Sequence, residues 1–155
     1  MKRGGTTIYS SLHTQFRMQN ENSKNKEVNS TVDVFDVWNS LKKEIDSSVI
    51  DFNFSEKEIW WCSFGKNIGN EQDGKNDNFE RPIVILKKWS QSFFIGLPMT
   101  SKNKINEKNE RFYFKYDIND VDLGYVILTQ IKSYSSKRLI RRMGKMSDKV
   151  FLELE

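Results

Sequence analysis

Residues 58–86, EIWWCSFGKNIGNEQDGKNDNFERPIVIL, decide the fold of this chain. The stretch begins as an aromatic-rich apolar run, continues as a loop rich in Gly, Asn and Asp, and ends with an Arg-Pro step that opens a second apolar run. Short apolar runs bounded by turn residues are typical of β-strands. Two strands fix both ends of the loop, so polar side chains near its bases should lie against a common surface. We therefore predict a site formed by Asn70, Glu71, Gln72 and Arg81.

The rest of the chain after residue 58 contains similar short apolar runs separated by polar loops. Five or six such strands with few helices are typical of a small, strongly bent sheet or barrel. We therefore expect a mainly β fold that ends in a short helix capped by Ser147. The predicted strands are 58–64, 82–89, 92–100, 111–116 and 125–134, followed by a helical turn at 135–139 and a short strand at 140–145.

The N-terminal third differs from the rest in composition. Residues 1–29 are polar and contain few apolar side chains. They cannot bury enough apolar surface to offset the entropy lost on ordering, so we predict a disordered polar tail. Residues 30–57 are expected to form an amphipathic helix and a linker, and residues 58–155 the barrel domain.

The expected helix covers residues 32–46, with Ser30 and Thr31 as candidate caps. Its apolar side chains recur at helical spacing, and they are Val34, Phe35, Trp38, Leu41 and Ile45. Such a helix either covers an exposed edge of the core or is an appendage that docks on the domain or on a partner. The sequence leaves both interpretations open.

Charge and residue content limit the classes of function. The 155 residues carry a net charge of +4 with a pI near 9.1, which permits nucleic-acid binding without requiring it. No apolar run approaches the roughly 18 residues of a membrane span, so we expect no membrane partner and a cytoplasmic location. The single cysteine, Cys62, excludes an internal disulfide, and its place in an apolar run predicts a buried thiol.

Several common catalytic groups are missing from the sequence. The only histidine, His13, lies in the predicted tail, so neither a paired-histidine nuclease nor a Ser-His triad is available. There is no Cys/His cluster for zinc, and the acidic residues lack the spacing of a magnesium site. We expect no metal site and no cofactor.

Four segments follow one another along the last two-thirds of the chain. They are GNEQDG at 69–74 with RPIV at 81–84, GLPMTS at 96–101, YVILTQIKSYSSKRL at 125–139 and RRMGKMS at 141–147. This order resembles the PemK/MazF family of toxin endoribonucleases, in which G-x-E-Q-x-G after a strand is followed by R-P and two hydrophobic residues. The resemblance implies an SH3-like barrel, a homodimer, a cognate antitoxin as partner, and metal-independent cleavage of single-stranded RNA.

The resemblance also implies which residues perform catalysis. The family's catalytic Arg and Thr match Arg81 and Thr100, and its products carry a 2′,3′-cyclic phosphate and a 5′-hydroxyl. RNA supplies its own nucleophile, the 2′-hydroxyl, so the enzyme must orient it and stabilise a charged phosphorane. A guanidinium suits the second task because it binds phosphate bidentately and stays charged. Since arginine is a poor base, we expect Glu71 to orient Arg81 or the 2′-hydroxyl.

Five further residues are predicted to bind the substrate, namely Asn70, Gln72, Ser101, Gln130 and Lys132. Asn70 stands where many family members have a serine, and both side chains can hydrogen-bond a phosphate. Gln130 matches a glutamine of the family, whereas Lys132 replaces an arginine.

Other interpretations of these residues remain open. Read locally, Arg81 is a surface arginine in an ion pair with Glu71 or Glu80, and Gln130 makes a structural hydrogen bond inside the barrel. The basic C-terminal third fits an RNA-backbone track or attraction for an acidic antitoxin peptide. The alternative function is a non-catalytic module of the same barrel fold, a gyrase-inhibitor-like protein or a degenerate toxin that binds antitoxin or nucleic acid.

Overall fold

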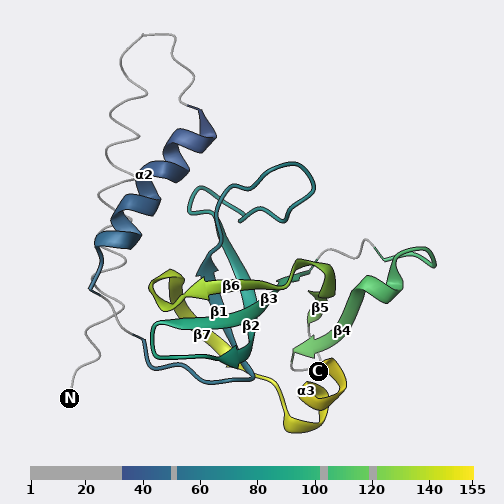
Figure 1. The fold of residues 1–155 in the computed structure, drawn as a ribbon. Helices are drawn as coiled ribbons and strands as arrows, with labels where there is room; N and C mark the ends of the chain where they lie inside the picture. The colour runs from purple at the N-terminus through teal and green to yellow at the C-terminus, as the bar shows by residue number, and fades with distance from the viewer. Residues whose placement is uncertain (1–32, 50–51, 102–104, 119–121) are drawn as a thin grey trace.

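The computed structural model describes residues 33–49, 52–101, 105–118 and 122–155 (Figure 1). The predicted disordered tail and the candidate caps Ser30 and Thr31 lie outside these residues. The strands within the described ranges are β1 Glu58–Ser63, β2 Glu80–Lys88, β3 Phe93–Thr100, β4 Tyr113–Ile118, β5 Asp122–Ile127, β6 Lys132–Ser135 and β7 Leu139–Lys145. The helices are α2 Val34–Ser47 and α3 Asp148–Leu154, with short 3-10 helices η1 Glu110–Phe112, η2 Leu128–Gln130 and η3 Ser136–Arg138.

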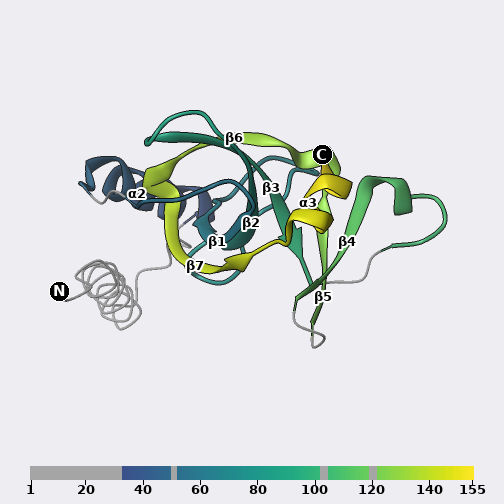
Figure 2. The same cartoon turned by 90° about the horizontal axis from the view of Figure 1, so that it is seen from below.

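Strand β3 lies at the centre of the sheet and pairs with three other strands. The strand order is β4-β5-β3-β2-β1-β7, every pair is antiparallel, and β6 pairs with β3 beside this path. The first half of β3, residues 93–96, pairs with β6, whereas Met99 and Thr100 at its end pair with β5. The strands therefore curve around a common interior (Figure 2), which confirms the expected mainly β fold with a strongly bent sheet.

The prediction of one continuous strand over residues 125–134 is wrong. The chain leaves β5 at Ile127, turns through η2, and re-enters the sheet as β6 at Lys132. Apolar Leu128 and Ile131 flank the polar Thr129 and Gln130, and no glycine or proline marks the turn, so hydrophobic pattern alone could not locate it. The turn carries the chain from one end of β3 to the other, and this bend helps to close the barrel.

Both helices have side-chain caps. The carboxylate of Asp33 accepts a hydrogen bond from the backbone N–H of Phe35 at 2.8 Å, so Asp33, and neither Ser30 nor Thr31, is the N-cap of α2. The hydroxyl of Ser147 accepts from the N–H of Val150 at 3.4 Å, which confirms the predicted cap of α3. Neither described helix is long and apolar enough to cross a membrane.

Two buried clusters fill the barrel. The first contains aromatic side chains of β1, β3 and β6 together with Phe54 of the linker, and its members are Phe54, Trp60, Cys62, Phe64, Ile83, Ile85, Phe94, Tyr134 and Leu139. The second cluster includes Phe151 of α3, and its members are Ile59, Val84, Leu97, Met99, Val126, Met146 and Phe151. The thiol of Cys62 is fully buried, as predicted, and this burial raises its pKa to about 12.

Tyr134 is the unusual member of the first cluster. Its ring stacks on Phe94 with the ring centroids 5.5 Å apart. Its hydroxyl is sealed from solvent and, in the described part of the chain, is the one fully buried side-chain oxygen or nitrogen without a hydrogen-bond partner. Burial raises the pKa of Tyr134, so the group stays protonated at neutral pH.

We predict that Tyr134→Phe leaves the free energy of unfolding unchanged or raises it by up to about 1 kcal/mol, because an unpaired buried hydroxyl contributes only its desolvation cost. Tyr134→Ala should instead lower it by roughly 3 to 5 kcal/mol, because it leaves a cavity. Urea unfolding followed by tryptophan fluorescence measures both. A clear loss of stability in Tyr134→Phe would mean that the hydroxyl has a partner.

Candidate active site at the base of the β1–β2 loop

The ends of β2 and β3 bring Arg81 and Thr100 together. Arg81 is the second residue of β2, and Thr100 is the last residue of β3. Ile83 lies opposite Pro98 in the antiparallel register. Arg81 precedes Ile83 by two residues and Thr100 follows Pro98 by two, so the same register places Arg81 level with Thr100.

The guanidinium of Arg81 is held by two backbone carbonyls. Its Nε donates to the carbonyl oxygen of Asp73 at 2.6 Å, and its Nη1 donates to that of Met99 at 3.1 Å. The residue is only 5% exposed, and the guanidinium carbon lies 5.8 Å from the ring centroid of Phe64. Burial lowers the pKa of Arg81, whereas the charge of Asp73 raises it. The side chain still remains charged at neutral pH, because the unperturbed pKa of arginine is above about 12.

The third nitrogen of this guanidinium, Nη2, makes none of the hydrogen bonds found among the described residues. It is not among their fully sealed, unpartnered atoms, although Arg81 as a whole is only slightly exposed. The two bonds to carbonyls therefore fix the orientation of the group while one edge remains able to bind an anion. The interpretation of Arg81 as a surface residue paired with Glu71 or Glu80 is wrong, since the residue is buried and Glu80 instead pairs with Arg141 at 3.3 Å.

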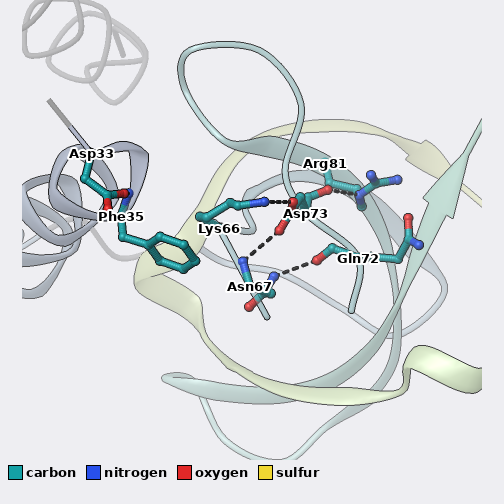
Figure 3. A network of polar contacts seen from close by, with 7 residues as sticks. All are labelled: Asp33, Phe35, Lys66, Asn67, Gln72, Asp73 and Arg81. Atoms are coloured by element: carbon teal, nitrogen blue, oxygen red, sulfur yellow. Dashed lines mark hydrogen bonds and ion pairs between the residues drawn. The ribbon is translucent and has the colours of Figure 1, made fainter. Parts of the chain in front are cut away.

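Asp73 organises the loop next to Arg81 (Figure 3). One carboxylate oxygen accepts from the backbone N–H of Asn67 at 2.7 Å, and the other pairs with the ammonium of Lys66. Desolvation raises the pKa of Asp73, but the hydrogen bonds from Lys66 and Asn67 and the charges of Lys66 and Arg81 outweigh it, so the pKa lies below its ordinary value. Asp73 is thus ionised at neutral pH. The side chain of Asn67 also donates to the carbonyl of Gln72 at 2.6 Å.

Asp73 is a functional residue that the sequence pattern did not reveal. The predicted acid was Glu71, but the side chain of Glu71 is exposed and its backbone N–H donates to the carbonyl of Ile68 at 3.2 Å. The available signal was the pairing of an acid with a lysine seven residues earlier, Lys66, across a loop rich in glycine. Nothing in that spacing distinguishes a loop-closing ion pair from two solvated charges.

The predicted substrate-binding residues divide into two groups. Gln72 and Gln130, 58 positions apart, come together, because the side-chain oxygen of Gln130 accepts from the backbone N–H of Gln72 at 3.4 Å. The other three, Asn70, Ser101 and Lys132, are exposed. Asn70 lies at the tip of the loop, Ser101 follows the end of β3, and Lys132 begins β6 opposite Gly96.

The two arms of the loop are joined at its base. The carbonyl of Phe79 accepts from the backbone N–H groups of Phe64 and Gly65 at 2.9 and 3.1 Å, and the N–H of Gly74 donates to the carbonyl of Gly65 at 2.7 Å. A Cβ on Gly74 would lie 2.0 Å from the carbonyl oxygen of Phe79, so only glycine fits there. Phe79 has a φ of +52°, a conformation that costs a bulky residue roughly 1–3 kcal/mol.

The described residues contain no group of three or more His, Cys, Asp and Glu side chains that could hold a metal ion. The groups near Arg81 that could act on a ligand are its fixed guanidinium, the hydroxyl of Thr100 and the amide of Gln72. Such a set can bind an anion and stabilise negative charge that develops on it.

A solved structure shows the same fold, and two others resemble the chain more weakly. The Form-I crystal structure of MazF from Deinococcus radiodurans is 20% identical and aligns over 67% of this chain and 91% of that chain, with a TM-score of 0.52. The Form-II MazE–MazF structure from the same organism is 16% identical over 67% and 89% of the two chains, with a TM-score of 0.48. An endoribonuclease in complex with its cognate antitoxin, from a mycobacterial species, is 12% identical over 66% and 87%, with a TM-score of 0.44.

No curated protein sequence matches the chain significantly. A family model does, and it covers residues 55–155, about two-thirds of the chain and all of the barrel. The chain therefore belongs to the family of PemK-like, MazF-like toxins of type II toxin–antitoxin systems.

Proposed function

We propose that this toxin is a metal-independent endoribonuclease that cleaves single-stranded RNA. The observation that carries the proposal is the state of Arg81: a buried, charged guanidinium, fixed by two carbonyls, level with Thr100 and with its Nη2 not bonded to any other described residue. A guanidinium held in this way has one nitrogen left to bind an anion. Family membership supports the same conclusion.

In the proposed reaction the RNA 2′-hydroxyl attacks the adjacent phosphorus. Its proton is lost, the bond from phosphorus to the 5′-oxygen breaks, and that oxygen gains a proton. The products are a 2′,3′-cyclic phosphate and a 5′-hydroxyl. Arg81 stabilises the extra negative charge of the phosphorane through Nη2, and the hydroxyl of Thr100 donates to a non-bridging oxygen. Glu71, exposed on the loop above them, is proposed to orient the attacking 2′-hydroxyl.

The remaining predicted residues would line the path of the RNA. The contact between Gln72 and Gln130 ties the loop to η2, beside the start of β6. Asn70, Ser101 and Lys132 present amide, hydroxyl and ammonium groups to solvent, which suits contacts with phosphates and base edges. We propose a cognate antitoxin as the protein partner, a homodimer as the active assembly, and the cytoplasm as its location.

The deciding experiment uses a long single-stranded RNA incubated in EDTA with the wild type, Arg81→Ala and Arg81→Lys. We expect discrete cuts with cyclic phosphate ends from the wild type, and rates lower by about 100- to 1000-fold in both variants, because lysine cannot reproduce the two fixed carbonyl bonds. Arg111→Ala, a change of an exposed arginine in η1, should cleave like the wild type. Intact RNA with a folded wild-type protein would favour the non-catalytic binding module.

A second prediction concerns Asp73→Asn. The pKa of Asp73 is lower in the folded protein than its unfolded value of about 3.9, so its contribution to stability is present above that pH and is lost as the pH falls through the folded pKa. Asp73→Asn should therefore be less stable than the wild type at pH 7, by about 1 kcal/mol or less because the pair is partly exposed.

The difference should be smaller at pH 3 than at pH 7, as measured by urea unfolding at both values. Asp77→Asn, an exposed change in the same loop, is the matched control and should leave the stability at pH 7 close to that of the wild type. An equal difference for Asp73→Asn at the two pH values would contradict the assignment of an ionised, loop-closing carboxylate.

A further inference from the structure

Helix α2 lies outside the part of the chain that matches the family. The family model begins at residue 55, and the helix ends at Ser47. Its buried side chains, Trp38, Leu41 and Ile45, are 5–8% exposed. They form a cluster separate from the two barrel clusters, and the one other buried member is Phe79 of the β1–β2 loop. The helix therefore packs on the loop that carries the candidate site.

Trp38 makes the closest contact of the helix with this loop. Its ring centroid lies 5.4 Å from that of Phe79. A Cβ on Gly65 would lie 2.4 Å from the indole carbons, so the indole rests directly on the backbone of Gly65, which has a φ of +104°. Trp38 thus touches one residue from each arm of the loop, Gly65 and Phe79, and its contact with Phe79 helps to offset the cost of that residue's positive φ.

A short series of contacts leads from these residues to Arg81. The carbonyl of Phe79 accepts from Gly65, and the carbonyl of Gly65 accepts from Gly74. The residue before Gly74 is Asp73, whose carbonyl receives the Nε of Arg81. The first two contacts are backbone hydrogen bonds across the loop, and the last runs from a side chain to the backbone, so displacement of one arm of the loop moves the acceptor that orients the guanidinium.

Two further contacts join the helix to the same region. The ammonium of Lys66, which pairs with Asp73, lies 5.9 Å from the ring centroid of Phe35 on α2 (Figure 3). The guanidinium of Arg138 lies 5.4 Å from the ring of Trp38 and donates to the carbonyl of Ser63 at 2.9 Å. The helix therefore contacts the loop and also the 3-10 helix η3 that flanks it.

We propose that Trp38 is a positioning residue of the site: by holding the two arms of the β1–β2 loop together, helix α2 keeps the carbonyl of Asp73 in place and so fixes Arg81. The inference rests on the proposed function for its effect on cleavage. Whether α2 holds the two arms of the loop together can be measured without RNA.

The test compares Trp38→Ala and Trp38→Phe with the wild type. A misplaced catalytic group costs up to about 100-fold in rate, so Trp38→Ala should lower kcat by about 10- to 100-fold while KM changes less than about 3-fold. Trp38→Phe, which keeps an aromatic contact with Phe79, should restore most of kcat. Amide hydrogen exchange at Gly65 and Gly74 should be faster in Trp38→Ala by about tenfold or more.

Phe151→Ala is the matched control. It also removes a buried aromatic side chain from a helix, but α3 packs in the second barrel cluster, away from the loop. This variant should lose stability while its kcat and the exchange of the loop amides stay close to the wild-type values. If Trp38→Ala fails to fold, Trp38→Leu takes its place in both measurements.

Two results would overturn the proposal. One is loop exchange in Trp38→Ala that matches the wild type, and the other is a kcat that is unchanged or higher, which would make α2 a neutral or inhibitory element. A wild type that cleaves no RNA would refute the proposed function alone. In that case hydrogen exchange still decides whether α2 orders the loop.

Discussion

The hydrogen bond from Arg81 to the carbonyl of Asp73 is the interaction on which the rest of the site depends. A guanidinium cannot lose its charge, so burying it requires acceptors already in position. The barrel supplies one, the carbonyl of Met99 at the end of β3, through the register of two neighbouring strands. The second must come from a loop, which therefore has to fold back over the strand end and stay there. The glycines, the strained Phe79 and the pair formed by Asp73 and Lys66 all serve that requirement.

The strands were predictable because their apolar runs are short and end at recognisable turns. The short C-terminal helix and its cap at Ser147 were predictable for the same reason. The break between β5 and β6 was not, because no glycine or proline marks the η2 turn and the bend is imposed by pairing with the two ends of β3. The cap of α2 was misplaced because three residues with capping side chains stand close together, and only the backbone geometry selects Asp33.

The candidate site shows the same division. Arg81 and Thr100 were predicted from the resemblance to the family, and the sheet register brings them level. The role of Asp73 was missed because it acts mainly through its backbone carbonyl, which no side-chain pattern reveals. The packing of Trp38 against Gly65 was equally hidden. Helical periodicity identified Trp38 as buried, but what covers a buried face is decided by segments that are distant in sequence.

The close approach of Gly74 to Phe79 divides the β1–β2 loop into two lobes. The first lobe carries Ile68, Gly69, Asn70 and Glu71, all exposed, and the second lobe is closed by paired hydrogen bonds between Lys75 and Glu80. Arg81 lies outside both lobes, and the loop holds it through the backbone carbonyl of Asp73, next to Gly74. Substitutions among the exposed residues 68–71 therefore leave the contacts of this guanidinium in place. The loop is modular in this sense: the sequence of its exposed tip can diverge while the position of Arg81 is kept.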